Sequence, residues 1–269
     1  MSNPIFILSQ SPRSGSTWLQ RVLTSTGDVL IWGEGGPYLF PLQTLWSDVA
    51  SLPPALNASA HTRNKYTLDV FRKHKADMWQ AVLHPEALMA LTCHKEYIEK
   101  LYGASAISEG FDRWGFKETN WEGFQLDTLL YQWPDAKIIL LTRRFGDSFR
   151  SQFPQGGGYI PQHDNRREDI KLWVDRWVVQ AQQTVDHRYS HGSPVIHVRY
   201  EDLKDAKQLA EVVEWCGLSA SDPEQHSTQI STTVHRDPDL TPMDLQHFQE
   251  QHERIKTLSE QLGYKETLT

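Results

Sequence analysis

The N-terminal stretch Pro4-Ile-Phe-Ile-Leu-Ser-Gln-Ser-Pro-Arg-Ser-Gly-Ser-Thr-Trp18 decides the fold of this chain. Its apolar run, Ile5 to Leu8, has the length of a buried strand, and the small-residue loop Ser11 to Thr17 follows it. A strand that feeds such a loop and then opens a helix presents backbone N–H groups and a positive helix end to an anion. We therefore expect a phosphate-binding loop, in which Gly15 lets the backbone approach closely and Arg13 supplies a permanent cation.

The loop differs from the phosphate loop of nucleoside-triphosphate enzymes because the Gly-Lys-Ser/Thr ending is missing. In those enzymes the ending supplies a lysine for the phosphates and a hydroxyl for magnesium. Read alone, the segment leaves two interpretations open, an anion site at the start of a helix and a plain structural turn.

Three further apolar runs have the length of strands, namely Trp114–Lys117, Lys137–Thr142 and Val195–Arg199. Segments with helical spacing lie between them, and this alternation is typical of βαβ units around a parallel sheet. We therefore predict an α/β fold in which helices flank a central parallel sheet. The helical patterns cover residues 18–26, 68–79, 84–101, 124–131, 169–189, 206–216 and 243–262, and Trp173 and Trp177 are expected to face the core.

Length and composition are those of a globular protein with one core. At 269 residues, 39% of them hydrophobic, the chain is expected to form a single domain over residues 1–269. The net charge of −7 argues against nucleic acid as a partner. No apolar run reaches 18 residues, so no membrane span is expected. Two cysteines and the lack of a signal-peptide profile favour a cytoplasmic protein.

The segment from Lys137 to Ser151 places cations at the end of a predicted strand. Arg143 and Arg144 follow its apolar run, at the strand end where open α/β sheets bind ligands. If the next residues are helical, Ser151 lies about two turns further on and can reach the same anion as Arg143. The alternative is an exposed arginine pair that Asp147 neutralises. A third segment, Val195 to Leu203, contains Tyr200 and by itself indicates only a core strand with a tyrosine at its edge.

Taken in this order, the three segments resemble the sulfotransferase family that uses 3′-phosphoadenylyl sulfate (PAPS). The loop Pro12-Arg-Ser-Gly-Ser-Thr-Trp-Leu19 looks like the family's 5′-phosphosulfate loop, in the branch that uses arginine. The resemblance covers residues 4–35 and 114–217 and implies the P-loop-like nucleotide-binding fold of that family. It implies PAPS as co-substrate, adenosine 3′,5′-bisphosphate as product and no metal. The co-substrate contacts that it implies are Arg13, Ser14, Gly15, Ser16, Thr17 and Trp18 in the loop, Arg143 and Ser151 at the 3′-phosphate, and Tyr200 near the adenine.

Sulfuryl transfer from PAPS develops negative charge on the bridging oxygen of the leaving 5′-phosphate. A fixed guanidinium at Arg13, together with backbone N–H donors, stabilises that charge where it appears. The family's additional C-terminal Arg-Lys-Gly contact to the 3′-phosphate is missing here, and Arg236 is a candidate replacement.

The resemblance also points to the base that deprotonates the acceptor. In arginine-type members a Gly-Glu at such a distance after the loop supplies the base, which makes Glu34 the first choice. Where aryl-type members place Lys-Thr-His, this chain has Lys117-Glu118-Thr119, so the histidine is absent. Lys117 is then a candidate to bind the transferring sulfonate, and Glu118 is the alternative base. The structural alternatives are a solvated Glu34 and a Lys117 that pairs with Glu118 or Glu122.

The acceptor stays open at this point. Residues 36–110 and 152–165 are expected to form the acceptor pocket and its lid, and their aromatic side chains suit a phenol, a glycan or a lipid-like alcohol equally well. His187 and His191 lack acidic or cysteine partners at a supportive spacing, so no metal site is expected. A homo-oligomer is compatible with the sequence. Two other functions remain as alternatives: a P-loop nucleotide kinase, and a non-catalytic nucleotide-binding protein on the same fold.

Overall fold

The computed structural model describes residues 3–34, 87–119, 121–153, 166–187, 193–219 and 242–265. Within these residues, one sheet of five parallel strands has the order β2-β3-β1-β4-β5. The strands are β1 (Ile5–Ser9), β2 (Val29–Glu34), β3 (Arg113–Glu118), β4 (Lys137–Thr142) and β5 (Val195–Arg199). The predicted α/β fold with a central parallel sheet is confirmed.

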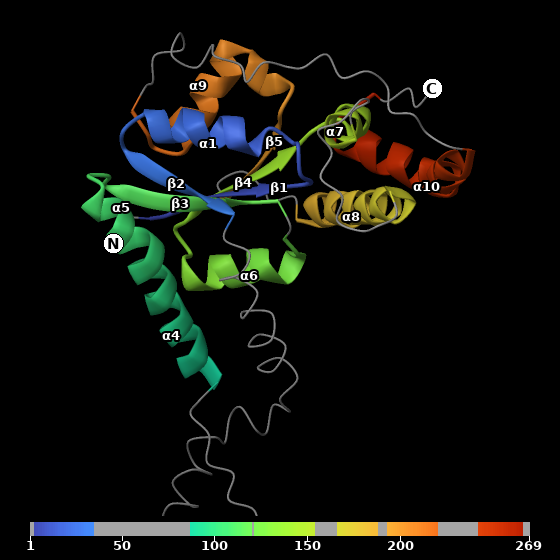
Figure 1. Cartoon of the computed structure of the whole chain (residues 1–269). Coiled ribbons are helices and arrows are strands. Elements are labelled where there is room, and N and C mark those ends of the chain that lie inside the picture. The colour runs from blue at the N-terminus through green and yellow to red at the C-terminus, as the bar shows by residue number, and fades with distance from the viewer. Residues whose placement is uncertain are drawn as a thin grey trace, which may run out of the picture.

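Helices cover both faces of the sheet (Figure 1). On one face lie α1 (Ser16–Ser25) and α9 (Ala206–Trp215); on the other lie α6 (Gly123–Gln132) and the run of α4 (Ala87–Ile98), the π-helical turn η1 (Glu99–Ala104) and α5 (Ser105–Ser108). The side chains of neighbouring β1 residues point to opposite faces of the sheet, because side chains alternate along a strand. Ile5 and Ile7 pack with α1 and α9, whereas Phe6 and Leu8 pack with α6. The continuous apolar run at the N-terminus is therefore the pattern of a strand buried on both sides.

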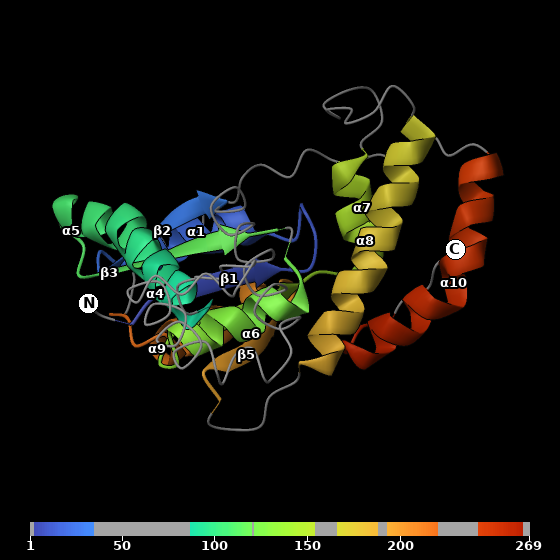
Figure 2. The same cartoon turned by 90° about the horizontal axis from the view of Figure 1, so that it is seen from below.

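Three more helices stand beside the strand ends from which the β1 and β4 chains leave the sheet (Figure 2). They are α7 (Phe145–Gln152), α8 (Arg166–Asp186) and α10 (Pro242–Gln261). They share a hydrophobic cluster of their own, in which Phe149, Trp177 and Ile255 are buried. Because α7 follows β4 almost directly, this cluster fixes α7 and α8 at the carboxyl edge of the sheet.

Of the elements that shape this edge, the sequence does not predict β2 and predicts α7 only conditionally. β2 was not predicted because Gly33 interrupts its apolar pattern near its end, where the strand is also exposed. The prediction for Ser151 depends on a helix directly after Arg144, and α7 is that helix. The predicted helix over 68–79 lies outside the described residues, as do Arg236, His191 and residues 36–86 and 154–165 of the expected pocket and lid.

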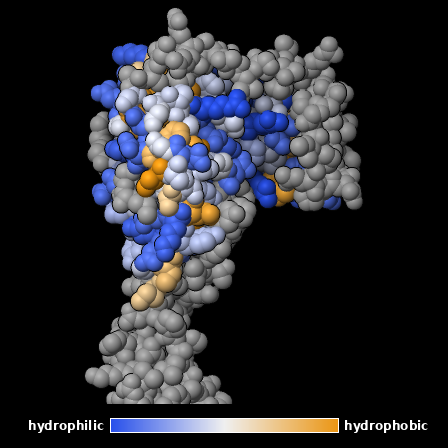
Figure 3. Space-filling view, turned by 60° about the vertical axis from the view of Figure 1, so that its left-hand side comes forward, coloured by the Kyte–Doolittle hydropathy of each residue, from blue (hydrophilic) through white to orange (hydrophobic). Residues whose placement is uncertain are grey.

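Figure 3 views the molecule with the left-hand side of Figure 1, where α4 and α5 lie, turned forward. Hydrophilic residues dominate the coloured surface there and small apolar spots are scattered among them. Exposed apolar side chains that stand singly are normal on protein surfaces, so this face gives no argument for a partner. Among the helices in the described ranges, none has the length and apolar character that crossing a membrane requires.

Candidate active site

The loop between β1 and α1 has the geometry of an anion site at a helix N-terminus. Gly15 is the residue that precedes α1, and it adopts a left-handed conformation with φ 89°. Within the described residues, Arg13 is the only non-glycine residue with positive φ, at 68°. Two left-handed residues so close together curl the backbone, which turns successive N–H groups toward one side. Arg13 and Thr17 are exposed at this turn, as a contact with a ligand requires.

Hydrogen bonds inside the loop hold its shape. The Ser14 hydroxyl donates to the Ser11 carbonyl oxygen at 2.7 Å, and the two serine Oγ atoms lie 3.0 Å apart. Ser14 is fully buried. Its side chain therefore supports the loop from within, and the part of Ser14 left for a ligand is the backbone N–H. Ser16 is buried as well, at the first turn of α1.

The three sequence motifs converge on this loop. Arg143, just past β4, donates from Nη1 to the carbonyl oxygen of Arg13 at 2.6 Å. Its guanidinium carbon lies 4.9 Å from the centre of the Tyr200 ring, and Trp18 meets the same ring edge-on at 6.0 Å. Tyr200 in turn covers Gly15 so closely that a Cβ on Gly15 would lie 2.1 Å from Tyr200 Cδ2. Residues from β1, β4 and β5 thus form one surface around the start of α1.

The two arginines after β4 have different environments. Arg144 lies 3.6 Å from Asp147, so the neutralised pair predicted as an alternative holds for Arg144. Arg143 instead points to the loop, and its Nε is buried with no hydrogen-bond partner among the described residues. A buried guanidinium N–H without a protein partner is available to an anion. Ser151 lies in the last turn of α7, half-buried, and makes no hydrogen bond to Arg143 within the described part of the chain.

Lys117 and Glu34 form an ion pair between neighbouring strands. Lys117 Nζ donates to Glu34 Oε1 at 2.7 Å, and the residues are paired in the register of β3 with β2. The alternative in which Lys117 pairs with Glu118 or Glu122 is wrong for this contact. Glu118 is buried and its Oε1 accepts from the backbone N–H of Thr119 at 2.8 Å. Of the two candidate bases, Glu34 is therefore the one whose carboxylate is accessible.

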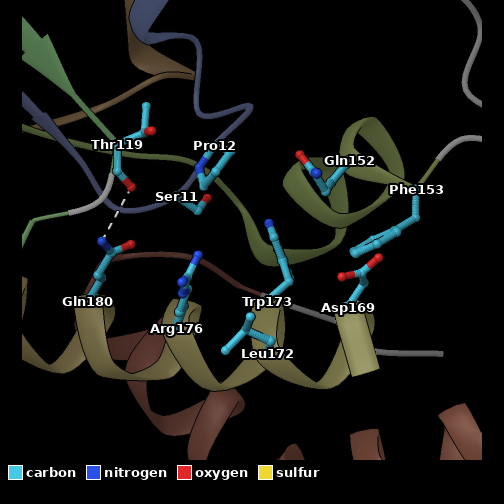
Figure 4. A pocket seen from close by; sticks show the side chains of 10 residues that line it. All are labelled: Ser11, Pro12, Thr119, Gln152, Phe153, Asp169, Leu172, Trp173, Arg176 and Gln180. Carbon is cyan, nitrogen blue, oxygen red and sulfur yellow. Dashed lines mark hydrogen bonds between the residues drawn. The ribbon is translucent and has the colours of Figure 1, made fainter. Parts of the chain in front are cut away.

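A small cavity of about 50 Å³ adjoins the loop (Figure 4). It lies at the carboxyl edge of the sheet, where open α/β sheets bind their ligands. Its walls come from the loop, the end of β3, the end of α7 and one face of α8, and they are formed by Ser11, Pro12, Thr119, Gln152, Phe153, Asp169, Leu172, Trp173, Arg176 and Gln180.

The α8 side of this cavity was missed by sequence reasoning, which assigned Trp173 to the core alone. Trp173 is indeed buried, and it also lines the cavity. The available signal was the placement of Asp169 and Arg176, which share its helix face at spacings of four and three residues. Asp169 is buried and Arg176 is exposed, so charged side chains flank a buried tryptophan where this helix face meets solvent. No cluster of His, Cys, Asp and Glu suited to a metal ion occurs in the described ranges.

Comparison with known proteins identifies the family. The model of the sulfotransferase family matches residues 4–222, and no curated protein gives a significant match. Among solved structures, the sulfotransferase domain from the curacin biosynthetic pathway is similar, with 16% identity, a TM-score of 0.54 and 99% of each chain covered. Sulfotransferase STF9 from Mycobacterium avium is similar at 14% identity and a TM-score of 0.51, over 96% of this chain and 75% of that one.

A third similar structure is mouse sulfotransferase SULT7A1 complexed with PAP, at 14% identity and a TM-score of 0.49, over 97% of this chain and 89% of that one. At such identities the two matches with TM-scores above 0.5 support the fold, and the family match, which spans most of the chain, shows the relationship. The loop, the arginine past β4 and the tyrosine past β5 all lie inside the matched region. The chain belongs to the sulfotransferase family.

Proposed function

We propose that the protein transfers the sulfuryl group of PAPS to a hydroxyl, or an amine, of an acceptor without the help of a metal. The observation that carries the proposal is the contact of Arg143 with the Arg13 carbonyl oxygen beneath the Tyr200 ring. It holds the Arg143 guanidinium and the Tyr200 ring against the backbone of the loop from which Arg13 extends, and a nucleotide with two separate phosphate groups requires cations and an aromatic ring so arranged.

The co-substrate binds across this surface. The amides of Ser14, Gly15, Ser16 and Thr17 and the guanidinium of Arg13 hold the 5′-phosphosulfate at the positive end of α1. Arg143 holds the 3′-phosphate with donors that include its buried Nε, and Ser151 adds a hydroxyl from α7. The exposed part of Trp18 and the Tyr200 ring lie beside the adenine.

Transfer then proceeds in line. The acceptor oxygen forms a bond to sulfur while the bond from sulfur to the bridging 5′-phosphate oxygen breaks, and its electron pair stays on that oxygen. Arg13 and the loop amides stabilise the charge that develops there. The acceptor proton passes to the Glu34 carboxylate. Lys117 orients that carboxylate through its 2.7 Å contact and carries positive charge beside the transferring sulfonate.

Calorimetry with adenosine 3′,5′-bisphosphate is the direct test. We expect tight binding by the wild-type protein, followed by transfer of radiolabelled sulfate from PAPS to an acceptor in a screen. Failure to bind the bisphosphate at millimolar concentration contradicts the proposal. Binding without transfer to any acceptor in a broad panel favours a non-catalytic nucleotide-binding protein instead.

A further inference from the structure

The residues on either side of Arg143 are both held by hydrogen bonds from outside β4. The Thr142 hydroxyl lies 2.9 Å from the hydroxyl of Tyr264, a residue just beyond α10. The backbone N–H of Arg144 donates to Glu201 Oε1 at 3.1 Å. We propose that Tyr264 is a positioning residue for the co-substrate, because it fixes the end of β4 and thereby places the Arg143 guanidinium for the 3′-phosphate. This inference rests on the proposed sulfuryl transfer and deepens its binding site.

The end of α10 is anchored independently of the Tyr264 hydroxyl. The backbone N–H of Tyr264 donates to the Ser259 carbonyl oxygen at 2.8 Å. Arg199 Nη1, from β5, donates to the Gly263 carbonyl oxygen at 2.6 Å. The Tyr264 side chain is buried in the hydrophobic cluster that α7, α8 and α10 share beside the sheet (Figure 2). The hydroxyl is therefore held at a fixed place, and its removal should leave the helix end where it is.

Thr142 meets Tyr264 inside the protein. It is the last residue of β4 and is fully buried, and its Oγ1 also lies 2.8 Å from His197 Nε2 on β5. Its carbonyl oxygen accepts from the backbone N–H of Tyr200 at 2.8 Å. Burial, and then the negative charge of Glu201, raise the pKa of Tyr264 above its ordinary value of 10, so its hydroxyl keeps its proton in the neutral range. The side chain and the backbone at the end of β4 are thus both bound by neighbouring elements.

Arg143 has little freedom to compensate for a shift of this strand end. Its Nη1 donates to the Arg13 carbonyl oxygen at 2.6 Å, and its guanidinium carbon lies 4.9 Å from the centre of the Tyr200 ring. Its Nε is buried with no hydrogen-bond partner among the described residues, so the place of the backbone decides whether this donor meets an anion. A binding group must be held to within about 0.5 Å by its surroundings, and here the anchored neighbours Thr142 and Arg144 do so.

The affinities for two nucleotides separate this role from a general loss of stability. Adenosine 3′,5′-bisphosphate and adenosine 5′-monophosphate differ only in the 3′-phosphate, so the ratio of their affinities reports on the Arg143 contact. We expect the wild type to bind the bisphosphate at least about tenfold more tightly. Tyr264→Phe removes one hydroxyl and should lower this ratio about fivefold, with the affinity for the monophosphate within about twofold of wild type. Calorimetry measures both affinities, and its stoichiometry gives the fraction of folded protein.

Two further variants control for the change itself. Tyr102→Phe removes the hydroxyl of another buried tyrosine, which packs in the cluster shared by the sheet, α4 and α6, and should leave the ratio within about twofold of wild type. Thr142→Val removes the contact with Tyr264 from the strand side and should lower the ratio as Tyr264→Phe does. Adding Tyr264→Phe to Thr142→Val should lower it no further, because both changes break the same link.

The Arg143→Ala background is the most specific test. If Tyr264 acts through Arg143, adding Tyr264→Phe to Arg143→Ala leaves the bisphosphate affinity within about twofold of Arg143→Ala alone. A further fall there, or an equal loss of affinity for both nucleotides in Tyr264→Phe, shows a structural role only and overturns the inference.

An unchanged affinity ratio in Tyr264→Phe overturns the inference as well; should that variant not fold, the ratio of Thr142→Val decides in its place. A wild type that binds the bisphosphate no better than the monophosphate overturns the assignment of Arg143 to the 3′-phosphate, and this inference with it. A wild type that binds neither nucleotide overturns the proposed function itself.

Discussion

Glu34 and Lys117 form an ion pair whose two members have unequal access to water. Lys117 Nζ lies 2.7 Å from Glu34 Oε1, and the lysine side chain is 9% exposed whereas the glutamate side chain is 54% exposed. Each residue lies at or next to the carboxyl end of its strand, the end of the sheet at which the phosphate loop begins. The pair thus offers an accessible carboxylate held in place by a shielded cation, and it is this carboxylate to which the proposed function assigns the acceptor proton.

Glu34→Gln separates binding from chemistry. We expect bisphosphate affinity within about twofold of wild type and a fall in kcat of about 100-fold to 10,000-fold, the usual range for loss of a general base. Calorimetry and a labelled-PAPS assay measure the two quantities. The control is Glu118→Gln, which alters the buried alternative base and should retain turnover. If Glu118→Gln abolishes kcat and Glu34→Gln does not, the assignment is reversed.

Because the two side chains of this ion pair differ in exposure, removing one or the other should lower the free energy of unfolding by different amounts. Glu34→Ala leaves a shielded ammonium without its carboxylate and should lower the free energy of unfolding by about 1–3 kcal/mol. Lys117→Met leaves a carboxylate that is already half in water, so its loss should be under about 1 kcal/mol. Urea unfolding of both variants measures this. Equal losses would mean that water reaches Lys117 as readily as Glu34.

The two cysteines should differ in their reactivity toward a thiol reagent. Burial raises the pKa of the Cys216 thiol from its ordinary 9.0 to about 12, whereas Cys93 is exposed. The folded protein therefore keeps Cys216 protonated at pH 8, and a thiol reagent should modify one cysteine before unfolding and two afterwards. The unfolded chain loses this proton from about pH 9 upward, so the contribution of Cys216 to stability declines between about pH 9 and 12. Two rapidly modified thiols in the native protein would contradict the burial.

Particular residues show how far the sequence could lead. The strand that ends at Ser9 and the cation at Arg143 were predictable because continuous apolar runs and the loop that follows them are local patterns. The pairing of Lys117 with Glu34 was not, because it depends on the register of an edge strand that Gly33 obscures. Nor was the cavity face of Trp173, since helical periodicity reports burial and cannot tell a core from a ligand site.

Arg143 and Arg144 allow adjacent residues to be compared. Arg143→Ala removes the guanidinium that contacts the Arg13 carbonyl oxygen and should weaken bisphosphate binding about 10-fold to 100-fold, as loss of charge-assisted hydrogen bonds does. Arg144→Ala removes a cation of the same kind that faces Asp147 at the surface, and should change affinity less than about threefold. Calorimetry measures the bisphosphate affinity of both variants. Equal losses would indicate that net charge, rather than the position of Arg143, attracts the nucleotide.

Gly15 is the position where the loop tolerates no side chain. Its φ of +89° strains an alanine, and a Cβ would also lie 2.1 Å from Tyr200 Cδ2. Gly27 has a similar φ of +82° with nothing within 4 Å of the added carbon, so Gly27→Ala measures the strain alone, about 1 kcal/mol. We expect Gly15→Ala to lose more stability in urea unfolding and to abolish bisphosphate binding, while Gly27→Ala still binds.

A double variant shows whether the Tyr200 ring is the cause. Tyr200→Ala removes the ring that a Cβ on Gly15 would meet, so the stability losses of Gly15→Ala and Tyr200→Ala should sum to more than the loss of the double variant. The summed loss of the two single variants minus the loss of the double variant measures the steric clash between the added Cβ and the Tyr200 ring. The backbone strain at φ +89° cancels, because it is present both in Gly15→Ala and in the double variant. Additive losses would place the ring away from the loop and remove the contact that joins β5 to the phosphate site.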